Sequence, residues 1–249
     1  MTEYDKISDL YLPLKRFSDN KISDLILDLR YNPGGYVSTC RFLCNCIVPK
    51  EGYKQIFQQC SYNNILSKYY EETTGKERTY TYFEDLTEIQ GNTLGTQMVP
   101  LNLSKIYVLT SNYTASASEA TIVCLRPYMN VTIIGETTVG KGLGSWTISD
   151  SEYKYALQPI TMRYYNAQGE STPDDGLSPD YFVPDGYLTR KKDLGDIKEP
   201  LLHQALQLIS PNSFSLMITS ENIQTEKQSL TPIGVPSYIT EYNQKRNRI

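Results

Sequence analysis

The chain has 249 residues, of which 39% are hydrophobic and 21% are charged, which is enough apolar material for one large domain with its own core. The formal net charge of −4 provides no basic surface, so nucleic acid is excluded as a partner. No run of the sequence is apolar over the length of a membrane span, and the polar, acidic start leads us to expect no signal peptide.

The first part of the chain alternates between helix-like and strand-like segments. Residues 5–17 have apolar side chains at helical spacing, which predicts an amphipathic helix interrupted at Pro13. Residues 24–30 are a short apolar run typical of a buried strand, and residues 31–35 form a glycine turn. Helical spacing returns in residues 37–48. Strand, turn and helix in this order make half of a βαβ unit.

A second unit of the same kind follows in the middle of the chain. Residues 105–110 predict a strand, 111–116 a turn, 117–127 a helix and 131–134 another strand. Two such units predict an α/β fold. The segment between them, residues 50–103, is polar and rich in tyrosine, and it is too long for a plain loop. We therefore expect an insertion with some β structure, including a strand at residues 79–83.

The last part of the chain predicts a small β appendage and one helix. The expected elements are strands at 145–148, 153–164 and 181–183, a turn at 166–169 and an amphipathic helix at 199–209. We divide the chain into a domain at 1–209, in which 50–103 is an insertion or lid, and a C-terminal extension at 210–249, which is rich in Ser, Thr, Asn and Gln.

The five cysteines do not have the spacing of a metal site. An odd number without paired CxxC or Cys/His motifs does not predict zinc. Cys40, Cys44 and Cys124 lie at helical spacing among apolar residues, which is typical of small buried side chains. We expect neither a metal nor a cofactor.

A serine and a lysine are the candidate catalytic residues. Ser116 stands in a turn of small residues just before a predicted helix, and Lys141 lies between Gly140 and Gly142 after the next strand. The one histidine, His203, is far away in the sequence. A serine hydroxyl needs a base to become a nucleophile. Lysine can be that base only when neutral, and burial lowers its reference pKa of ~10.4 by up to ~3–5 units.

The neighbourhood of Lys141 suits such a base, because the residues that follow it bring no carboxylate. Glu136 is the nearest acid in the sequence, and we expect its side chain to point away from Lys141. The N–H of Ala117, at the start of the helix, could face a developing oxyanion. A second donor could come from the turn at Gly34 and Gly35, because glycine lets a backbone N–H approach a substrate closely.

Each motif also has a structural explanation. Residues 116–119 spell S-x-x-E, a capping box in which Glu119 closes the first turn of a helix. The glycine turn can be a tight connection between a strand and a helix. Residues 135–141 spell G-x-x-x-x-G-K, but Gly142 replaces the Ser or Thr that a phosphate loop needs, and a strand rather than a helix is predicted next. We therefore exclude a nucleotide as a partner.

Three of these segments together resemble the C-terminal processing peptidases, or tail-specific proteases. LILDLRYNPGG at residues 25–35 resembles the family's strand and glycine turn, TASASE at 114–119 its nucleophile motif, and IGETTVGKG at 134–142 its base motif. A weaker match is GLSPD at 176–180. The distance along the chain from Ser116 to Lys141 is the one this family uses.

The resemblance implies a serine endopeptidase that cleaves proteins or peptides near exposed C-terminal tails. It implies a ClpP/crotonase-like ββα superhelical core, Ser116 as nucleophile and Lys141 as general base. Ala117 and either Gly34 or Gly35 would form the oxyanion hole. It also implies a periplasmic or cell-envelope location, and it leaves a homo-oligomer open.

The sequence departs from the family in two places. Ser145 stands where many members carry a glutamine that orients the base, so Ser145 and Glu119 are the candidate supporting residues. Many members also have an N-terminal PDZ domain, for which we find no counterpart in this chain. A catalytically latent peptide-binding protein on the same scaffold is the alternative. A crotonase-like activity on an acyl thioester is a third hypothesis.

Overall fold

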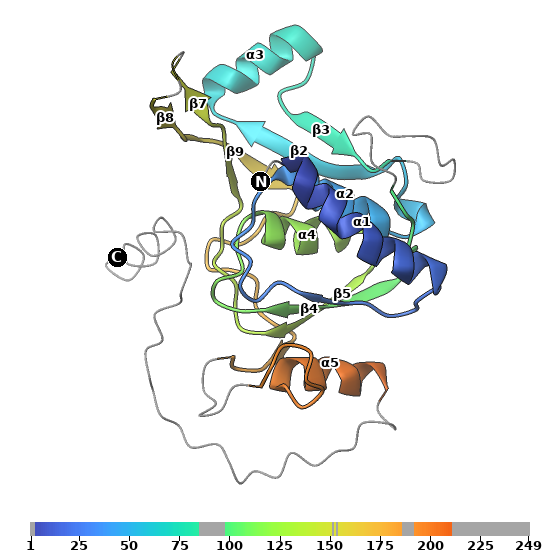
Figure 1. Ribbon diagram of the computed structural model, residues 1–249. Helices are drawn as coiled ribbons and strands as arrows, with labels where there is room; N and C mark the ends of the chain where they lie inside the picture. The colour runs from blue at the N-terminus through green and yellow to red at the C-terminus, as the bar shows by residue number, and fades with distance from the viewer. Residues whose placement is uncertain (1–2, 85–97, 151, 153, 186–191, 211–249) are drawn as a thin grey trace.

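Two four-stranded sheets with helices between them form the centre of the described part of the chain, which also has a two-stranded sheet (Figure 1). The computed structural model describes residues 3–84, 98–150, 152, 154–185 and 192–210, with side chains from residue 9 onward. The predicted mixed α/β fold is confirmed. The predicted C-terminal extension lies outside the described residues except for residue 210, and the predicted superhelical core and the domain boundaries stay predictions.

The first sheet is parallel and is buried on both faces. In spatial order its strands are β1 (Ile26–Asp28), β4 (Lys105–Thr110), β5 (Asn130–Gly135) and β10 (Tyr181–Phe182). The side chains of Ile106, Val108, Ile133 and Ile134 are inaccessible to solvent, as expected for a parallel sheet covered on both sides. The carboxyl ends of parallel strands meet at one edge, so the turns after β1, β4 and β5 lie together.

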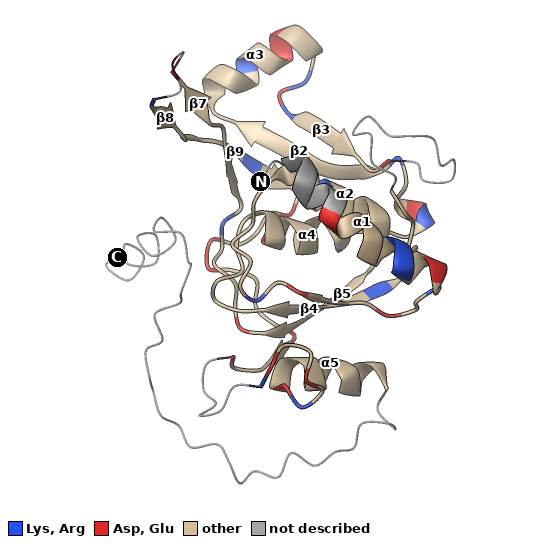
Figure 2. Ribbon diagram, viewed as in Figure 1, with Lys and Arg blue, Asp and Glu red and all other residues tan. Residues whose placement is uncertain are grey.

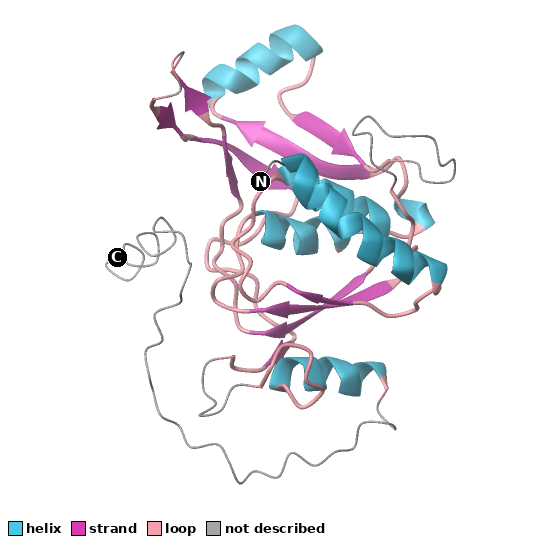
Figure 3. Ribbon diagram, in the orientation of Figure 1, coloured by secondary structure: helices cyan, strands magenta, loops and turns pink. Residues whose placement is uncertain are grey.

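Helices cover both faces of this sheet (Figure 3). On one side lie α1 (Glu3–Asp19), α2 (Val37–Ile47) and α4 (Ala117–Leu125), and on the other lies α5 (Pro200–Ile209). Helix α4 also contacts β2 and β9 of the second sheet, so it is buried on nearly every side. Glu119 is the single charged residue in α4 (Figure 2). All five cysteines are free and buried, which confirms the prediction for Cys40, Cys44 and Cys124.

The second sheet is antiparallel and takes much of its length from the tyrosine-rich segment. Its strands in spatial order are β3 (Thr79–Tyr82), β2 (Ile56–Tyr62), β9 (Ile160–Tyr165) and β6 (Leu143–Ser145). The short helix η1 (Lys50–Gly52) precedes β2, α3 (Asn64–Thr74) packs on β2, and β7 (Ile148–Ser149) pairs with β8 (Ala156–Leu157).

Strand β2 and helix α3 were not predicted. Strand β2 pairs with β3 on one side and β9 on the other, so residues 56–62 and 79–82 of this segment are part of the sheet rather than a cover over it. Gln58 and Gln59 are buried in β2, and the Gln59 amide donates to the carbonyl of Asn166 at 2.8 Å. Two consecutive buried glutamines remove the alternation of apolar and polar residues from which a strand is recognised.

Helix α1 continues through Pro13, so the predicted interruption there is wrong. Proline lacks the N–H that would bond to the carbonyl of Asp9 one turn earlier. Both Asp9 and Pro13 are exposed, so water can satisfy that carbonyl in place of the missing N–H.

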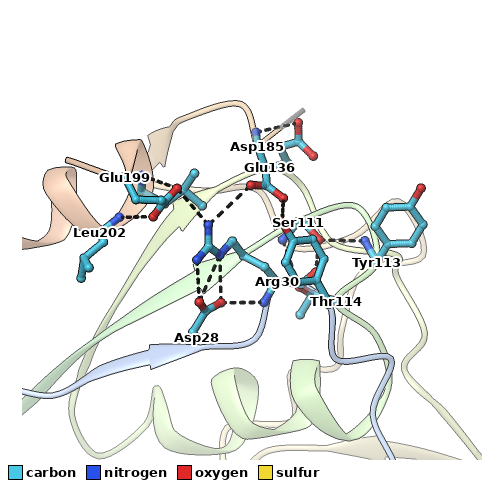
Figure 4. Close-up of polar contacts among 11 residues, drawn as sticks. Asp28, Arg30, Ser111, Tyr113, Thr114, Glu136, Asp185, Glu199 and Leu202 are labelled. Atoms are coloured by element: carbon cyan, nitrogen blue, oxygen red, sulfur yellow. Dashed lines mark hydrogen bonds and ion pairs between the residues drawn. The ribbon is translucent and has the colours of Figure 1, made fainter. Parts of the chain in front are cut away.

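A buried arginine at the end of β1 holds the first sheet to α5 (Figure 4). Arg30 is 2% exposed, and its guanidinium contacts Asp28 at 2.6 Å, Glu199 at 2.9 Å and Asp185 at 3.5 Å. Burial opposes the charge, but the hydrogen bond with Asp28 and the attraction of the carboxylates outweigh burial and raise the pKa of Arg30. The guanidinium therefore stays charged and joins segments that lie far apart in the chain.

Glu199 has a second role at the start of α5. Its carboxylate accepts from the N–H groups of Leu201 and Leu202 at 3.3 and 2.9 Å, so it caps the helix that it attaches to Arg30. The position of α5 on the sheet thus depends on the same carboxylate that neutralises Arg30.

We expect Arg30→Met to destabilise the fold by about 3–5 kcal/mol, because it leaves the buried Glu199 carboxylate without its counter-ion. Denaturant unfolding measures the change. Lys15→Met is the control, since the Lys15–Asp19 pair is exposed and exposed pairs contribute little to stability. Equal stability losses in the two variants would contradict this account of Arg30.

Candidate active site

Ser116 stands in a strained turn immediately before α4. Its backbone angles are φ 57° and ψ −118°, a region that residues other than glycine rarely adopt and that persists only where the surroundings impose it. The same strand–turn–helix strain presents the nucleophile of α/β-hydrolases. Two contacts hold the turn to the end of β1: Thr114 Oγ1 donates to the carbonyl of Leu29 at 2.7 Å, and the N–H of Ala115 donates to that of Asn32 at 3.3 Å.

The glycine turn after β1 packs directly against the serine. Gly34 has φ +99°, and a Cβ atom there would lie 2.7 Å from the carbonyl oxygen of Ala115 and 2.8 Å from the Cβ of Ser116. Only glycine fits such a position. The N–H of Gly34 is already used, because it donates to Asn32 Oδ1 at 2.9 Å.

Two backbone N–H groups near Ser116 have no hydrogen-bond acceptor among the described residues, those of Gly35 and Ala117. Ala117 is the first residue of α4, where N–H groups have no partner within the helix. Gly35 follows Gly34 with φ +152° and open space on its Cβ side.

The carboxylate of Glu119 joins the serine turn to the lysine turn. Glu119 is fully buried. Its Oε2 accepts from the N–H of Ser116 at 2.7 Å and from the N–H of Lys141 at 2.9 Å. Its Oε1 accepts from the N–H of Gly140 at 2.7 Å and from Thr138 Oγ1 at 2.5 Å. Four donors satisfy both oxygens, which is what a buried carboxylate requires.

Lys141 is half-buried, and this burial lowers the pKa of its amine, against the opposing effect of the Glu119 charge. The acid that acts on Lys141 is therefore Glu119, which the sequence places 22 residues away. The carboxylate of Glu136 instead accepts from the N–H of Asp185 at 3.4 Å (Figure 4).

A tyrosine that the sequence analysis did not single out also reaches both turns. The hydroxyl of Tyr164 lies 3.2 Å from the carbonyl oxygen of Ser116 and 3.1 Å from that of Lys141. Tyr164 belongs to β9, and no motif or local spacing connects it with either residue. The chain has 21 tyrosines, so residue type alone does not distinguish Tyr164 from the others.

The structure thus brings together the main chain of the serine turn, the glycine turn and the lysine turn. The hydrogen bonds that join the serine turn to the lysine turn are made with main-chain atoms of Ser116 and Lys141. Ser145, at the end of β6, has no hydrogen-bond partner for its hydroxyl among the described residues. His203 is buried in α5, on the opposite side of the first sheet from α4, with Nδ1 3.2 Å from the carbonyl of Ile197.

The model of peptidase family S41 matches residues 2–183, which include all three turns. The chain belongs to this family. It is 27% identical over 180 residues to a carboxy-terminal-processing protease from Bartonella bacilliformis, covering 71% of this chain and 35% of that protein. The family predicted from the motifs is confirmed by the family model and by this relative.

Solved structures also resemble the fold. An S41 protease from Bacteroides fragilis is 28% identical with a TM-score of 0.69, covering 82% of this chain and 49% of that one. A lipoprotein from Streptococcus agalactiae, at 21% identity, a TM-score of 0.52 and coverage of 74% and 58%, shares the fold. The chain therefore spans about half the length of the Bacteroides protein and about a third of the Bartonella protein.

We expect Glu119→Gln to lower the pKa of Lys141 further, because the variant removes the Glu119 charge, which raises that pKa. The amide offers one acceptor oxygen in place of two, so stability also falls, by about 1–3 kcal/mol for the donors left unpaired. Carbon NMR titration of the Lys141 Cε measures the pKa, and denaturant unfolding measures the stability.

Glu170→Gln is the matched control for Glu119→Gln. The Glu170 carboxylate accepts from Asn166 Nδ2 at 3.0 Å near the surface, and we expect it to leave the Lys141 titration unchanged. A Lys141 pKa that is the same in Glu119→Gln and the unsubstituted protein would refute the electrostatic link.

Proposed function

We propose that this chain is the protease domain of a serine endopeptidase in which Ser116 is the nucleophile and Lys141 the general base. The observation that supports it best is the shared carboxylate: one oxygen of Glu119 holds the N–H groups of both residues. The depressed pKa of Lys141 and membership of family S41 agree with these roles.

In the proposed reaction neutral Lys141 accepts the hydroxyl proton of Ser116 as Oγ attacks the scissile carbonyl carbon. The protonated amine then donates that proton to the leaving nitrogen as the peptide bond breaks. Water, deprotonated by the same amine, hydrolyses the resulting ester and releases Ser116. Acylation and deacylation each begin with the lysine neutral, which burial favours.

The oxyanion of the tetrahedral intermediate is bound, in this proposal, by the N–H groups of Ala117 and Gly35. Both are without an acceptor among the described residues near Ser116. Gly34, the other candidate, donates its N–H to Asn32 and shapes the turn instead. Removal of one oxyanion donor typically costs on the order of 100- to 1000-fold in rate.

We propose unstructured C-terminal segments of proteins as the substrate class. Support comes from the sequence motifs and from the relative in Bartonella, which is named for carboxy-terminal processing. Glu119, which bonds both turns, is the stronger candidate for the supporting role than Ser145, whose hydroxyl makes no hydrogen bond with the described residues.

We expect Ser116→Ala to reduce cleavage of an unstructured C-terminal peptide by on the order of 10⁴-fold or more, because no other group can form the ester. The fold should remain stable, because the variant keeps the main-chain contacts of residue 116 with Glu119 and Tyr164. A chromogenic or fluorogenic peptide assay measures turnover. Ser149→Ala, in the exposed strand β7, is the control that keeps the activity.

We expect kcat/KM to rise with pH through an apparent pKa below the ordinary lysine value. The base is active when neutral, and burial lowers the pH at which the amine loses its proton. In Glu119→Gln the remaining activity should have its midpoint at lower pH still. A midpoint at or above the ordinary lysine pKa would be incompatible with Lys141 as the base.

A catalytically latent peptide-binding protein is the second candidate. It is favoured by Ser145, which stands where many family members carry the glutamine that orients the base. A fluorophosphonate that reacts with activated serines distinguishes the active peptidase from the latent protein. Labelling of Ser116 supports the peptidase. Binding of C-terminal peptides without labelling supports the latent protein.

A periplasmic or cell-envelope location is proposed on the family resemblance. Within the described ranges, no helix has both the length and the apolar character to cross a bilayer. The five cysteines are buried, so an oxidising compartment would find none of these thiols on the surface. Further domains, such as a PDZ domain, and self-association belong to the same proposal about the whole protein.

A further inference from the structure

The hydroxyl of Tyr164 lies between the two segments that carry the proposed nucleophile and base. It is 3.2 Å from the carbonyl oxygen of Ser116 and 3.1 Å from that of Lys141, and its third neighbour is Thr172 Oγ1 at 3.0 Å. A phenol has one proton to donate and can accept from another hydroxyl. The proton is shared between the two carbonyls, and Thr172 supplies the hydrogen bond that the phenol oxygen accepts.

Tyr164 is fixed firmly enough to set the distance between the main chains of Ser116 and Lys141. The residue is 5% exposed, and its main chain is part of β9, where Tyr164 pairs with Cys60 of β2. Thr172, which orients the hydroxyl, is 1% exposed. Burial raises the pKa of the Tyr164 phenol well above its ordinary value, so the group remains a donor throughout the pH range of the proposed reaction.

The carbonyl contacts complement those of Glu119. Glu119 bonds the N–H groups of Ser116 and Lys141, whereas Tyr164 bonds their carbonyl oxygens. Each of the two residues is therefore held at both of its peptide groups by the same pair of buried side chains. Because two side chains bridge the serine turn and the lysine turn, they fix the relative orientation of the two turns as well as the distance between them.

We propose that Tyr164 is a positioning residue, which sets the relative placement of Ser116 and Lys141 through their main-chain carbonyls. The inference rests on the proposed function for its effect on catalysis. The contacts involve no side-chain atom of Ser116 or Lys141, so Tyr164 takes no part in proton transfer.

Tyr164→Phe tests the proposal, because it removes only the hydroxyl. We expect kcat to fall by about 10- to 100-fold with KM unchanged, as follows from a misplacement of reacting groups by an ångström or less. Thr172→Val removes the group that orients the phenol, and it should lower kcat in the same direction by a smaller factor.

Tyr128→Phe is the matched control. The hydroxyl of Tyr128 also donates to a main-chain carbonyl, that of Ile56 at 2.7 Å, away from both turns. The two variants lose the same group, so a general loss of stability would reduce the activity of both. We expect Tyr128→Phe to keep kcat, while the melting temperatures of the two variants fall by comparable amounts.

A second readout does not require turnover. In Tyr164→Phe the relaxed lysine turn should let water reach the amine, so the Lys141 pKa, followed by carbon NMR of its Cε, moves up toward the ordinary lysine value. It should stay unchanged in Tyr128→Phe. If the unsubstituted protein cleaves no peptide, the proposed function fails and this titration alone decides the role of Tyr164. An unchanged Lys141 pKa, or an unchanged kcat in an active enzyme, overturns the inference.

Discussion

The arrangement of the site depends on one buried carboxylate. Glu119 accepts hydrogen bonds from the serine turn and from the lysine turn at the same time, and it has no access to water. Removal of a buried charge from water is costly unless all of its acceptor sites are filled. The two turns supply those donors, so the charge is stable only where the turns are correctly placed. The folded state is therefore stable only when the serine turn and the lysine turn take the positions that let both donate to Glu119.

The same carboxylate explains how a capping box and a catalytic turn can be one motif. Glu119 closes the first turn of α4 by accepting from Ser116, as S-x-x-E predicts. Its remaining acceptor sites reach Thr138, Gly140 and Lys141, outside the helix. The structural explanation of residues 116–119 and the proposed role of Ser116 are therefore compatible, because the side chain that closes the first turn of the helix also accepts from the N–H of Lys141, the proposed base.

The local sequence pattern was sufficient to predict the helices, strands and turns around the site. It was insufficient to predict the contacts between them. The glycine turn, the start of α4 and the strands β4 and β5 follow from apolar runs and small residues. Strand β2 was missed because buried glutamines conceal its pattern, and the helix break at Pro13 was wrong because an exposed carbonyl tolerates the loss of its partner. Tyr164 and the reach of Glu119 to Lys141 depend on packing between distant segments, for which a single sequence carries no local signal.

The charge network around Arg30 has a consequence for where this chain can be shortened. The family match ends at residue 183, yet two of the carboxylates that neutralise Arg30 belong to Asp185 and Glu199. Arg30 lies directly before the glycine turn, and the hydroxyl of Ser111 donates to its carbonyl (Figure 4). A recombinant fragment trimmed to the family boundary would leave the Arg30 guanidinium, next to the glycine turn, with Asp28 as its remaining carboxylate among these three partners. The charge network that holds the first sheet therefore extends to the start of α5, beyond the residues that the family model matches.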